Sequence, residues 1–393
     1  MKISNIMITG GAGFIGTHLV QALVPHAGKI VVLDSLLPQV HGPSPVFSTQ
    51  LQSKAVCIQG DVTDPDAVAR VAQDHPDIQA IVHLAAFTGT GQSMYELRDY
   101  NQANAGGTAT LLQSIVEKRW PSLEHVVHAS SRAIYGEGAY ADPDNPACLV
   151  YPPPRTGAAL ADGDWSPHMP GDGRTLTVRP TPEDAPAQPN SFYGATKLVQ
   201  EEYLKVILAA LGIPLTMLRF QNVYGPGQSL KNPYTGVIGV FFSRLVQGKG
   251  LEVYEDGEVS RDFVYVEDVV QALAAALHRK VAGTYNVGSG VFTTLYELVA
   301  VLQATLGTDL PVTCRGTYRV GDIRHAAADL TRVHAALDYA PQCSFAEGIS
   351  RYVQWAQGQE AMSESAMQAA ASMLAAAGLS NVSAENSEKE ASK

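Results

Sequence analysis

Short apolar runs alternate with longer segments of helical periodicity through the first part of the chain. Apolar runs bounded by polar or glycine positions are typical of buried strands, and an apolar stripe at helical spacing is typical of a helix that covers a sheet. This alternation predicts an α/β fold with a doubly wound parallel sheet. The expected strands are 6–9, 30–33, 55–58, 80–84, 125–129 and 215–220, and the expected helices are 13–23, 65–72 and 104–118.

The turn between the first strand and the first helix is rich in glycine. Gly10, Gly13 and Gly16 are spaced three residues apart, and Phe14 and Ile15 lie between the last two. Glycine allows a tight turn and lets the backbone approach a pyrophosphate, and the following helix N-terminus offers free N–H groups to the phosphates. The first part of the chain is therefore predicted to be a dinucleotide-binding domain of the Rossmann type.

The second apolar run ends in an acidic residue, Asp34. A carboxylate at this place accepts hydrogen bonds from the ribose hydroxyls of NAD and repels the additional phosphate of NADP. The predicted cofactor is NAD.

Residues 137–189 interrupt the alternation. This insert holds eleven of the 23 prolines, and it also contains Tyr151 and Trp165, which a plain linker would lack. We expect an ordered flap beside the substrate rather than a linker. The predicted organisation is a Rossmann domain over 1–200 that includes the insert, a smaller C-terminal substrate-binding lobe over 201–356 with segments returning to the sheet, and a tail over 357–393. Within the tail, 361–377 has helical propensity without a clear companion face, and 379–393 is expected to be disordered.

Charge and composition narrow the possible partners. The formal net charge of −11 argues against a nucleic-acid partner. No apolar run is long enough to span a membrane and no secretory pattern precedes the first strand, so a cytoplasmic location is expected. The four cysteines are widely scattered, which predicts reduced thiols and no metal site.

Tyr193 and Lys197 are the most informative pair in the chain. They lie four residues apart in a predicted helix and therefore share one face. A nearby ammonium favours the phenolate and lowers the pKa of the phenol, so the pair can accept a proton from an alcohol while a cofactor accepts the hydride. Because Tyr-x-x-x-Lys is common by chance, this interpretation depends on the glycine turn and Asp34 upstream.

Ordered motifs along residues 3–355 give the chain a family resemblance. It resembles the extended short-chain dehydrogenases/reductases and, within them, the nucleotide-sugar epimerases. The motifs that carry the resemblance are the glycine turn, 60–64, 83–86, 130–136, the Tyr193/Lys197 pair, 219–226, 261–266 and 321–325. The segment 132–138, the insert and the segment 221–230 most resemble those of dTDP-L-rhamnose 4-epimerases, which make dTDP-6-deoxy-L-talose.

The resemblance implies a role for each matched residue. Tyr193 is the base, Lys197 tunes it and holds the nicotinamide ribose, and Ser131 bonds the substrate hydroxyl. Asp61 is expected to reach the adenine amino group, whereas Asn104 fits either a brace behind the site or a simple helix cap. The expected cofactor-binding residues are Gly10, Gly13, Phe14, Ile15, Gly16, Asp34, Asp61, Val62, Leu84, Ala85, Ala86, Asn104, Tyr193 and Lys197. The expected substrate-binding residues are Ser131, Arg132, Asn222, Arg261 and Arg324, the last two gripping a diphosphate if they are not surface ion-pair arginines. A homodimer is expected.

Departures from the relatives decide the expected reaction. Dehydratases of this family place an acidic pair directly after the Ser/Thr, and decarboxylases keep a Glu two positions after it, whereas this chain has Arg132 and Ala133 there.

Relatives with this insert often carry paired cysteines in it, but here Cys148 and His168 have no second pair, so no metal is expected.

Three interpretations remain open at this point. The first is an NAD-dependent nucleotide-sugar 4-epimerase acting on a dTDP- or UDP-sugar. The second is a keto-sugar reductase with an exchangeable cofactor. The third is a non-catalytic NAD-binding scaffold, which the Ser131, Tyr193 and Lys197 set disfavours.

Overall fold

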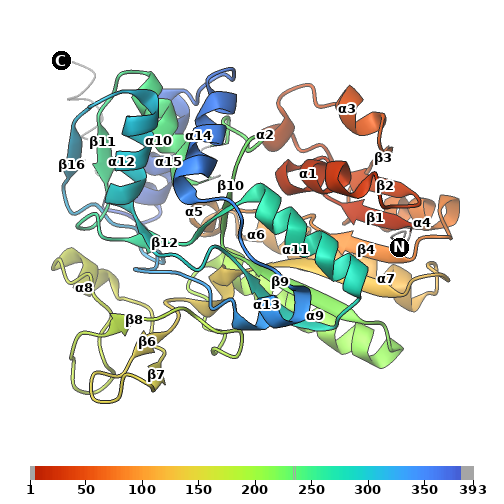
Figure 1. Cartoon of the computed structure of the whole chain (residues 1–393), viewed down its shortest axis with the longest axis horizontal. Coiled ribbons are helices and arrows are strands. Elements are labelled where there is room, and N and C mark those ends of the chain that lie inside the picture. The colour runs from red at the N-terminus through yellow and green to blue at the C-terminus, as the bar shows by residue number, and fades with distance from the viewer. Residues whose placement is uncertain (1–4, 233, 235, 382–393) are drawn as a thin grey trace.

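The computed structural model describes residues 5–232, 234 and 236–381. Its centre is a sheet of seven parallel strands in the order β14-β9-β5-β4-β1-β2-β3. The expected doubly wound parallel sheet is confirmed, and each predicted strand lies within a residue or two of an observed one (Figure 1). The strands are β1 (Ile6–Thr9), β2 (Ile30–Asp34), β3 (Val56–Gln59), β4 (Ala80–His83), β5 (His125–Ser131), β9 (Leu215–Phe220) and β14 (Gly283–Val287).

Helices cover both faces of the sheet because its strands are apolar on both sides. In β1, Ile6 and Ile8 pack with one helix layer, whereas Met7 between them packs with the other. The first layer contains α1 (Phe14–Leu23), α11 (Val266–Arg279) and α13 (Thr331–Leu337). The second contains α4 (Pro65–Asp74), α7 (Gly107–Val116) and α9 (Phe192–Leu211).

The helix expected over 104–118 is divided in two. A π-helical turn, Asn101–Gly106, precedes α7. Short helical segments connect the strand ends around it. These are α2 (Pro38–His41), α3 (Thr49–Gln52), α5 (Thr90–Ser93), α6 (Leu97–Tyr100) and a 3₁₀ turn, Arg132–Tyr135.

A second lobe with its own apolar core lies beside the carboxyl edge of the sheet (Figure 1). The chain crosses between the lobes more than once, since α11 and β14 return to the Rossmann half. Helices of this lobe are α10 (Val237–Val246), α12 (Leu295–Leu306) and α14 (Phe345–Ala356). Its strand pairs are β10 (Asn222–Tyr224) with β13 (Phe263–Tyr265), β11 (Leu251–Val253) with β16 (Val312–Cys314), and β12 (Ser260–Arg261) with β15 (Thr293–Thr294).

The insert is folded. It forms a three-stranded antiparallel sheet and a short helix at the lower left of Figure 1. Tyr151 packs against the cluster of Ile134, Tyr135 and Ala185, and the ring of Trp165 lies 6.3 Å from that of Tyr318 in the second lobe. The elements are β6 (Tyr140–Ala141), β7 (Leu149–Val150), α8 (Gly157–Ala161) and β8 (Thr177–Val178).

The tail has a companion surface that its sequence did not reveal. Helix α15 (Glu364–Ala376) buries Leu374 and packs against α5, where a Cβ on Gly91 would lie 3.4 Å from Leu374. The expectation of disorder from residue 379 is wrong for 379–381, because Leu379 accepts a hydrogen bond from Val320 N at 2.9 Å and Asn381 accepts one from Tyr318 N at 2.8 Å. The rest of that segment, 382–393, lies outside the described residues.

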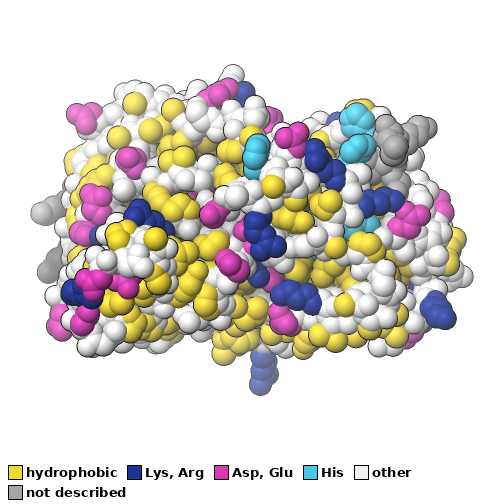
Figure 2. All heavy atoms as spheres, turned by 60° about the horizontal axis from the view of Figure 1, so that its bottom comes forward, with side chains coloured by type: hydrophobic (Ala, Val, Ile, Leu, Met, Phe, Trp, Pro, Cys, Tyr) yellow, Lys and Arg dark blue, Asp and Glu magenta, His cyan; other side chains and the backbone are white. Residues whose placement is uncertain are grey.

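The surface is mixed in charge on the face that carries the insert. Figure 2 turns this face forward and shows basic and acidic side chains interspersed among hydrophobic ones. All four cysteines are free thiols. Among the described residues, no helix combines the length and apolarity needed to cross a membrane.

Candidate active site

A cleft of about 560 Å³ lies at the carboxyl edge of the parallel sheet. Gly10 follows β1, Asp34 ends β2, Leu84 follows β4 and Ser131 ends β5, and all of them line this cleft. Parallel strands place their carboxyl ends at the same edge, which is where ligands bind in open α/β sheets. The cleft therefore has the location of a dinucleotide site.

The glycine turn packs too closely for any other residue. Gly10 has φ +68°, and a Cβ on it would lie 2.8 Å from the backbone nitrogen of Ala85. A Cβ on Gly16 would lie 2.5 Å from the Cα of Gly11. Both contacts hold the start of α1 against the strand ends, and Gly13, Phe14 and Ile15 line the cleft beside them. The helix N-terminus is thereby presented to the cleft, as pyrophosphate binding requires.

Asp34 is fixed by two backbone groups. Its carboxylate accepts hydrogen bonds from Ala12 N and Leu36 N, both at 2.9 Å, and the residue is 8% exposed. The carboxylate thus borders the cleft in one orientation. An anionic phosphate approaching this position would meet a fixed negative charge.

Ser131, Tyr193 and Lys197 meet at the inner end of the cleft. Helix α9 begins beside Ser131 because Ser191 caps it, accepting a hydrogen bond from Gly194 N at 3.1 Å. Tyr193 and Lys197 then follow on one face, and Lys197 Nζ donates to the carbonyl of Ala129 at 2.9 Å.

The electrostatics of Tyr193 differ from the expectation. Burial raises the pKa of Tyr193, while a hydrogen bond with Ser131 and the charge of Arg132 lower it. Ser131 and Arg132 are therefore the groups that lower the pKa of Tyr193, whereas the sequence suggested that Lys197 would do so. Burial in turn lowers the pKa of Lys197 to about 7, against the opposing effect of Glu201. Lys197 is not among the groups that shift the pKa of Tyr193 because its ammonium is directed to the Ala129 carbonyl.

Asn104 braces the site from behind and is not a simple cap. It lies in the π-helical turn, is fully buried, and pairs with both the N–H and the carbonyl of Phe87 at 2.7 and 3.1 Å. Its Nδ2 also donates to Thr196 Oγ1 at 2.9 Å, and Thr196 Oγ1 donates to the carbonyl of Tyr193 at 2.8 Å. Asn104 therefore joins the cofactor loop to the first turn of α9. π-helical turns recur at functional sites.

The remaining expected cofactor residues surround the same cleft. Asp61, Val62, Leu84, Ala85 and Ala86 all line it.

The expected substrate residues other than Ser131 lie beyond the cleft. Arg132 borders a small adjoining cavity, and Gln221 lines both this cavity and the main cleft. Asn222 lies on β10 and donates its backbone N–H to Asp262 O at 2.9 Å. Arg261 is half-buried, and its Nη1 donates to Ser260 O at 2.8 Å. Within the described part of the chain, no carboxylate lies within ion-pair distance of Arg261.

Arg324 does not have the position expected of a phosphate ligand. Its guanidinium binds both carboxylate oxygens of Asp256 at 2.6 and 2.7 Å and Glu255 at 2.9 Å, and the residue is 5% exposed. A guanidinium held by two carboxylates has few donors left for a ligand. The physical reason is the acidic loop 255–256, which lies far from Arg324 in sequence.

Sequence reasoning missed Arg319, in the same segment. Its guanidinium lies 4.8 Å from the ring centroid of Tyr254 and donates to the Tyr254 hydroxyl at 3.1 Å. Burial lowers the pKa of Arg319, but Tyr254, Asp322 and, to a smaller extent, the cleft residue Tyr234 raise it above its usual value. In the sequence, Arg319 could be noticed only as an arginine two residues before Gly321, and no neighbouring residue distinguishes it from Arg324.

No group of three His, Cys, Asp or Glu side chains within residues 5–232, 234 and 236–381 is placed to hold a metal ion. His168 is paired with Asp164, with Nε2 2.8 Å from each carboxylate oxygen.

The fold and the cleft define an NAD-dependent enzyme of the extended short-chain dehydrogenase/reductase class. The sequence matches the NAD dependent epimerase/dehydratase family over residues 6–158 and 166–288, and the chain belongs to this family. The expected family and cofactor, NAD, are thereby confirmed.

Individual relatives are nucleotide-sugar epimerases. The dTDP-L-rhamnose 4-epimerase of Burkholderia thailandensis is 41% identical over 355 residues, covering 89% of this chain and 94% of the relative. The UDP-glucose 4-epimerase of Mycolicibacterium smegmatis is 30% identical over 352 residues, covering 89% and 97%. The solved UDP-N-acetylglucosamine 4-epimerase from Methanobrevibacter ruminantium M1, in complex with UDP-N-acetylmuramic acid, has a TM-score of 0.72 at 28% identity and covers 92% of this chain and 100% of that one.

Tyr193→Phe removes the phenolic oxygen while keeping the ring. If Tyr193 is the proton acceptor, we expect turnover to fall by roughly 10²–10⁴-fold, the usual contribution of a general acid–base group, with NAD affinity nearly unchanged. Steady-state kinetics beside NAD titration measures this. The matched control is Tyr296→Phe on α12, which is 39% exposed, does not line the cleft and should have no effect. If Tyr193→Phe keeps more than half of the wild-type activity, Tyr193 is not the proton acceptor.

Asp34→Ser removes the fixed negative charge beside the expected ribose. The wild-type protein should bind NAD more tightly than NADP, and this variant should narrow the difference because its hydroxyl neither repels a phosphate nor pairs as strongly with the ribose. Dissociation constants for both dinucleotides give the answer. Asp74→Ser, an exposed change at the end of α4, serves as control. Equal or tighter NADP binding by the wild type would contradict the role of Asp34.

Proposed function

We propose that the protein is an NAD-dependent nucleotide-sugar 4-epimerase whose substrate is dTDP-L-rhamnose and whose product is dTDP-6-deoxy-L-talose. The observation that carries the proposal is that Ser131, Tyr193 and Lys197 all line the dinucleotide cleft, while the two positions directly after Ser131 hold Arg132 and Ala133. An elimination needs an additional acid and base next to the sugar, and these two positions supply neither. Oxidation, rotation and reduction at one carbon need none beyond the three.

The chain's own residues can move the proton of the C4 hydroxyl. The Tyr193 phenol hydrogen-bonds Ser131, so a sugar hydroxyl entering between them would exchange hydrogen bonds with both groups. The cleft residues around Gly10 and Asp34 would hold NAD, which would supply the hydride acceptor and donor for C4. The charge of Arg132 favours the phenolate of Tyr193 while the 4-keto sugar exists. Tyr193, which has not moved, then returns the proton to the oxygen on C4.

The choice of the dTDP-sugar rests on similarity to the Burkholderia relative, which is higher than the 30% to the UDP-glucose 4-epimerase of M. smegmatis. The second candidate is a UDP-hexose 4-epimerase, such as one for glucose or N-acetylglucosamine. A UDP-sugar ligand in the Methanobrevibacter structure supports it. A keto-sugar reductase is the third, because the same three residues also serve a net reduction.

The cofactor state and a substrate panel separate these functions. We expect the purified protein to carry bound NAD and to convert dTDP-L-rhamnose without added cofactor, with the product identified by NMR. UDP-, GDP- and CDP-sugars form the rest of the panel. Faster conversion of a UDP-hexose would favour the second candidate. Consumption of external NADH or NADPH in proportion to product would establish a reductase and refute epimerisation.

A homodimer through α7 and α9 is part of the proposal. These helices pack together on one face of the sheet, and their outer sides expose Val116, Tyr203 and Val206, the last at 65%. Apolar side chains at such exposure are a reason for association with a second copy. Light scattering during size-exclusion chromatography should give twice the mass of one chain, and the Val206→Glu substitution should lower the measured mass. A monomer mass for the wild type would count against the dimer.

A further inference from the structure

Arg155 belongs to the insert, yet it is buried in the second lobe. Its side chain is 4% exposed, although the insert around it lies largely at the surface. Nothing in the proposed proton or hydride transfer uses it. A buried guanidinium is retained only where its donors are satisfied, so its partners indicate what it does.

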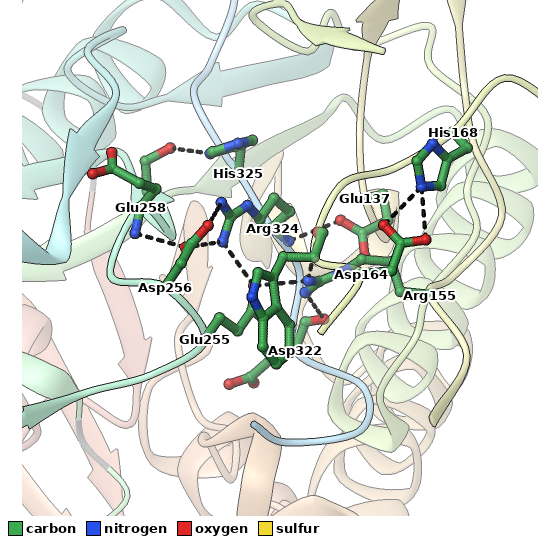
Figure 3. Close-up of polar contacts among 12 residues, drawn as sticks. Glu137, Arg155, Asp164, His168, Glu255, Asp256, Glu258, Asp322, Arg324 and His325 are labelled. Carbon is green, nitrogen blue, oxygen red and sulfur yellow. Dashed lines mark hydrogen bonds and ion pairs between the residues drawn. The ribbon is translucent and has the colours of Figure 1, made fainter. Parts of the chain in front are cut away.

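The donors of Arg155 reach four segments of the chain. Nε donates to Glu137 just after the Ser131 turn at 3.0 Å, and Nη1 donates to Glu255 in the second lobe at 2.8 Å. Within the insert, Nη1 also donates to the carbonyl of Trp165 at 3.0 Å. Nη2 donates to the carbonyl of Asp322 at 3.0 Å. Figure 3 shows Arg155 at the junction of these segments.

The two carboxylates pass this connection on to Arg324. Glu137 Oε2 accepts from the backbone N–H of Arg324 at 2.8 Å, and Glu255 Oε2 is shared between Arg155 and Arg324 (Figure 3). The carbonyl of Arg324 then accepts from Ser260 N at 3.1 Å and from Arg261 Nη1 at 3.4 Å. One continuous set of polar contacts thus runs from the insert to Arg261.

We propose that Arg155 is a positioning residue: it locks the insert onto the second lobe and thereby holds Arg261 free to grip the diphosphate of the nucleotide sugar. This inference rests on the proposed function, because the diphosphate belongs to that substrate. It also changes the expected behaviour of the insert from a flap that opens and closes to a fixed wall. Opening would leave Glu137 and Glu255, which are 0% and 3% exposed, buried without Arg155.

Charge competition explains why removing Arg155 would affect Arg261. Burial lowers the pKa of Arg261, the charges of Asp322, Glu255 and Glu137 act against this in that order, and the charge of Arg155 opposes the three carboxylates. With Arg155 in place, its guanidinium neutralises the carboxylates of Glu137 and Glu255. Without it, Glu255 keeps Arg324 as its partner and Glu137 keeps only the backbone N–H of Arg324. We expect Arg261 then to turn toward the Glu137 carboxylate and away from a ligand phosphate.

The test uses the NAD-loaded full-length protein with dTDP and UDP as probes of the diphosphate grip. For Arg155→Met we expect the dissociation constant of the nucleotide bound by the wild type to rise about tenfold, since misplacing a positioning contact has effects of this order. NAD affinity should change less than about twofold, and KM for the sugar nucleotide should rise more than kcat falls. Arg174→Met is the matched control. Arg174 pairs with Asp144 at 2.8 Å and with Asp172, but it is 41% exposed and all its partners lie within the insert.

A double-mutant cycle separates positioning from general damage. If Arg155 acts through Arg261, then Arg155→Met/Arg261→Ala should bind the nucleotide no more weakly than Arg261→Ala alone. Should Arg155→Met fail to fold, Arg155→Lys carries the same cycle, because it keeps the charge but not the fork that reaches several acceptors. Unchanged nucleotide affinity in a folded variant, or additive effects in the cycle, would overturn the inference and leave the proposed function intact. A wild type that binds neither dTDP nor UDP would overturn both.

Discussion

One buried ion pair holds the reacting groups in register. Glu201 on α9 is fully buried, and its two oxygens accept from Nε and Nη2 of Arg219 on β9 at 2.9 and 2.7 Å. Glu201 also accepts from Ser130 Oγ at 2.5 Å. Ser130 is the neighbour of Ser131, and Glu201 lies one helical turn after Lys197. Glu201 therefore joins the helix that carries Tyr193 to β9 through Arg219, and to β5, the strand that carries Ser131, through Ser130.

The distribution of paired and unpaired cations separates structure from chemistry. Arg219, Arg155 and Arg324 are each neutralised by buried carboxylates. Among the described residues, Arg132, Arg261 and Lys197 have no carboxylate at ion-pair distance; Lys197 lines the cleft and Arg132 borders its adjoining cavity. A protein with a net charge of −11 thus concentrates uncompensated positive charge where an anionic substrate would bind.

Much of the Rossmann half follows from the sequence because its signals are local. Apolar runs, the glycine turn and an acidic residue at the end of a strand each lie within a few residues, and parallel topology then brings Asp34, Leu84 and Ser131 to one edge. The substrate side depends on contacts between distant segments. Arg319 and Arg324 look equivalent in sequence, and only the acidic residues Glu255 and Asp256 decide which of them is neutralised. The docking of α15 onto α5 likewise has no local signal, since its apolar face is short.

The insert shows why the two halves differ in this way. Chemistry at C4 needs groups from one sheet edge, which the shared fold supplies without the insert. The match to the family omits residues 159–165, so part of the insert lies outside what the family has in common. Even so, the insert supplies Arg155, which joins the turn after Ser131 to the loop at Glu255. The insert is therefore tied by buried charges to Arg324 in the second lobe. The helix that carries Tyr193 and Lys197 does not depend on that connection, because Glu201 anchors it to Arg219 and Ser130 through separate contacts.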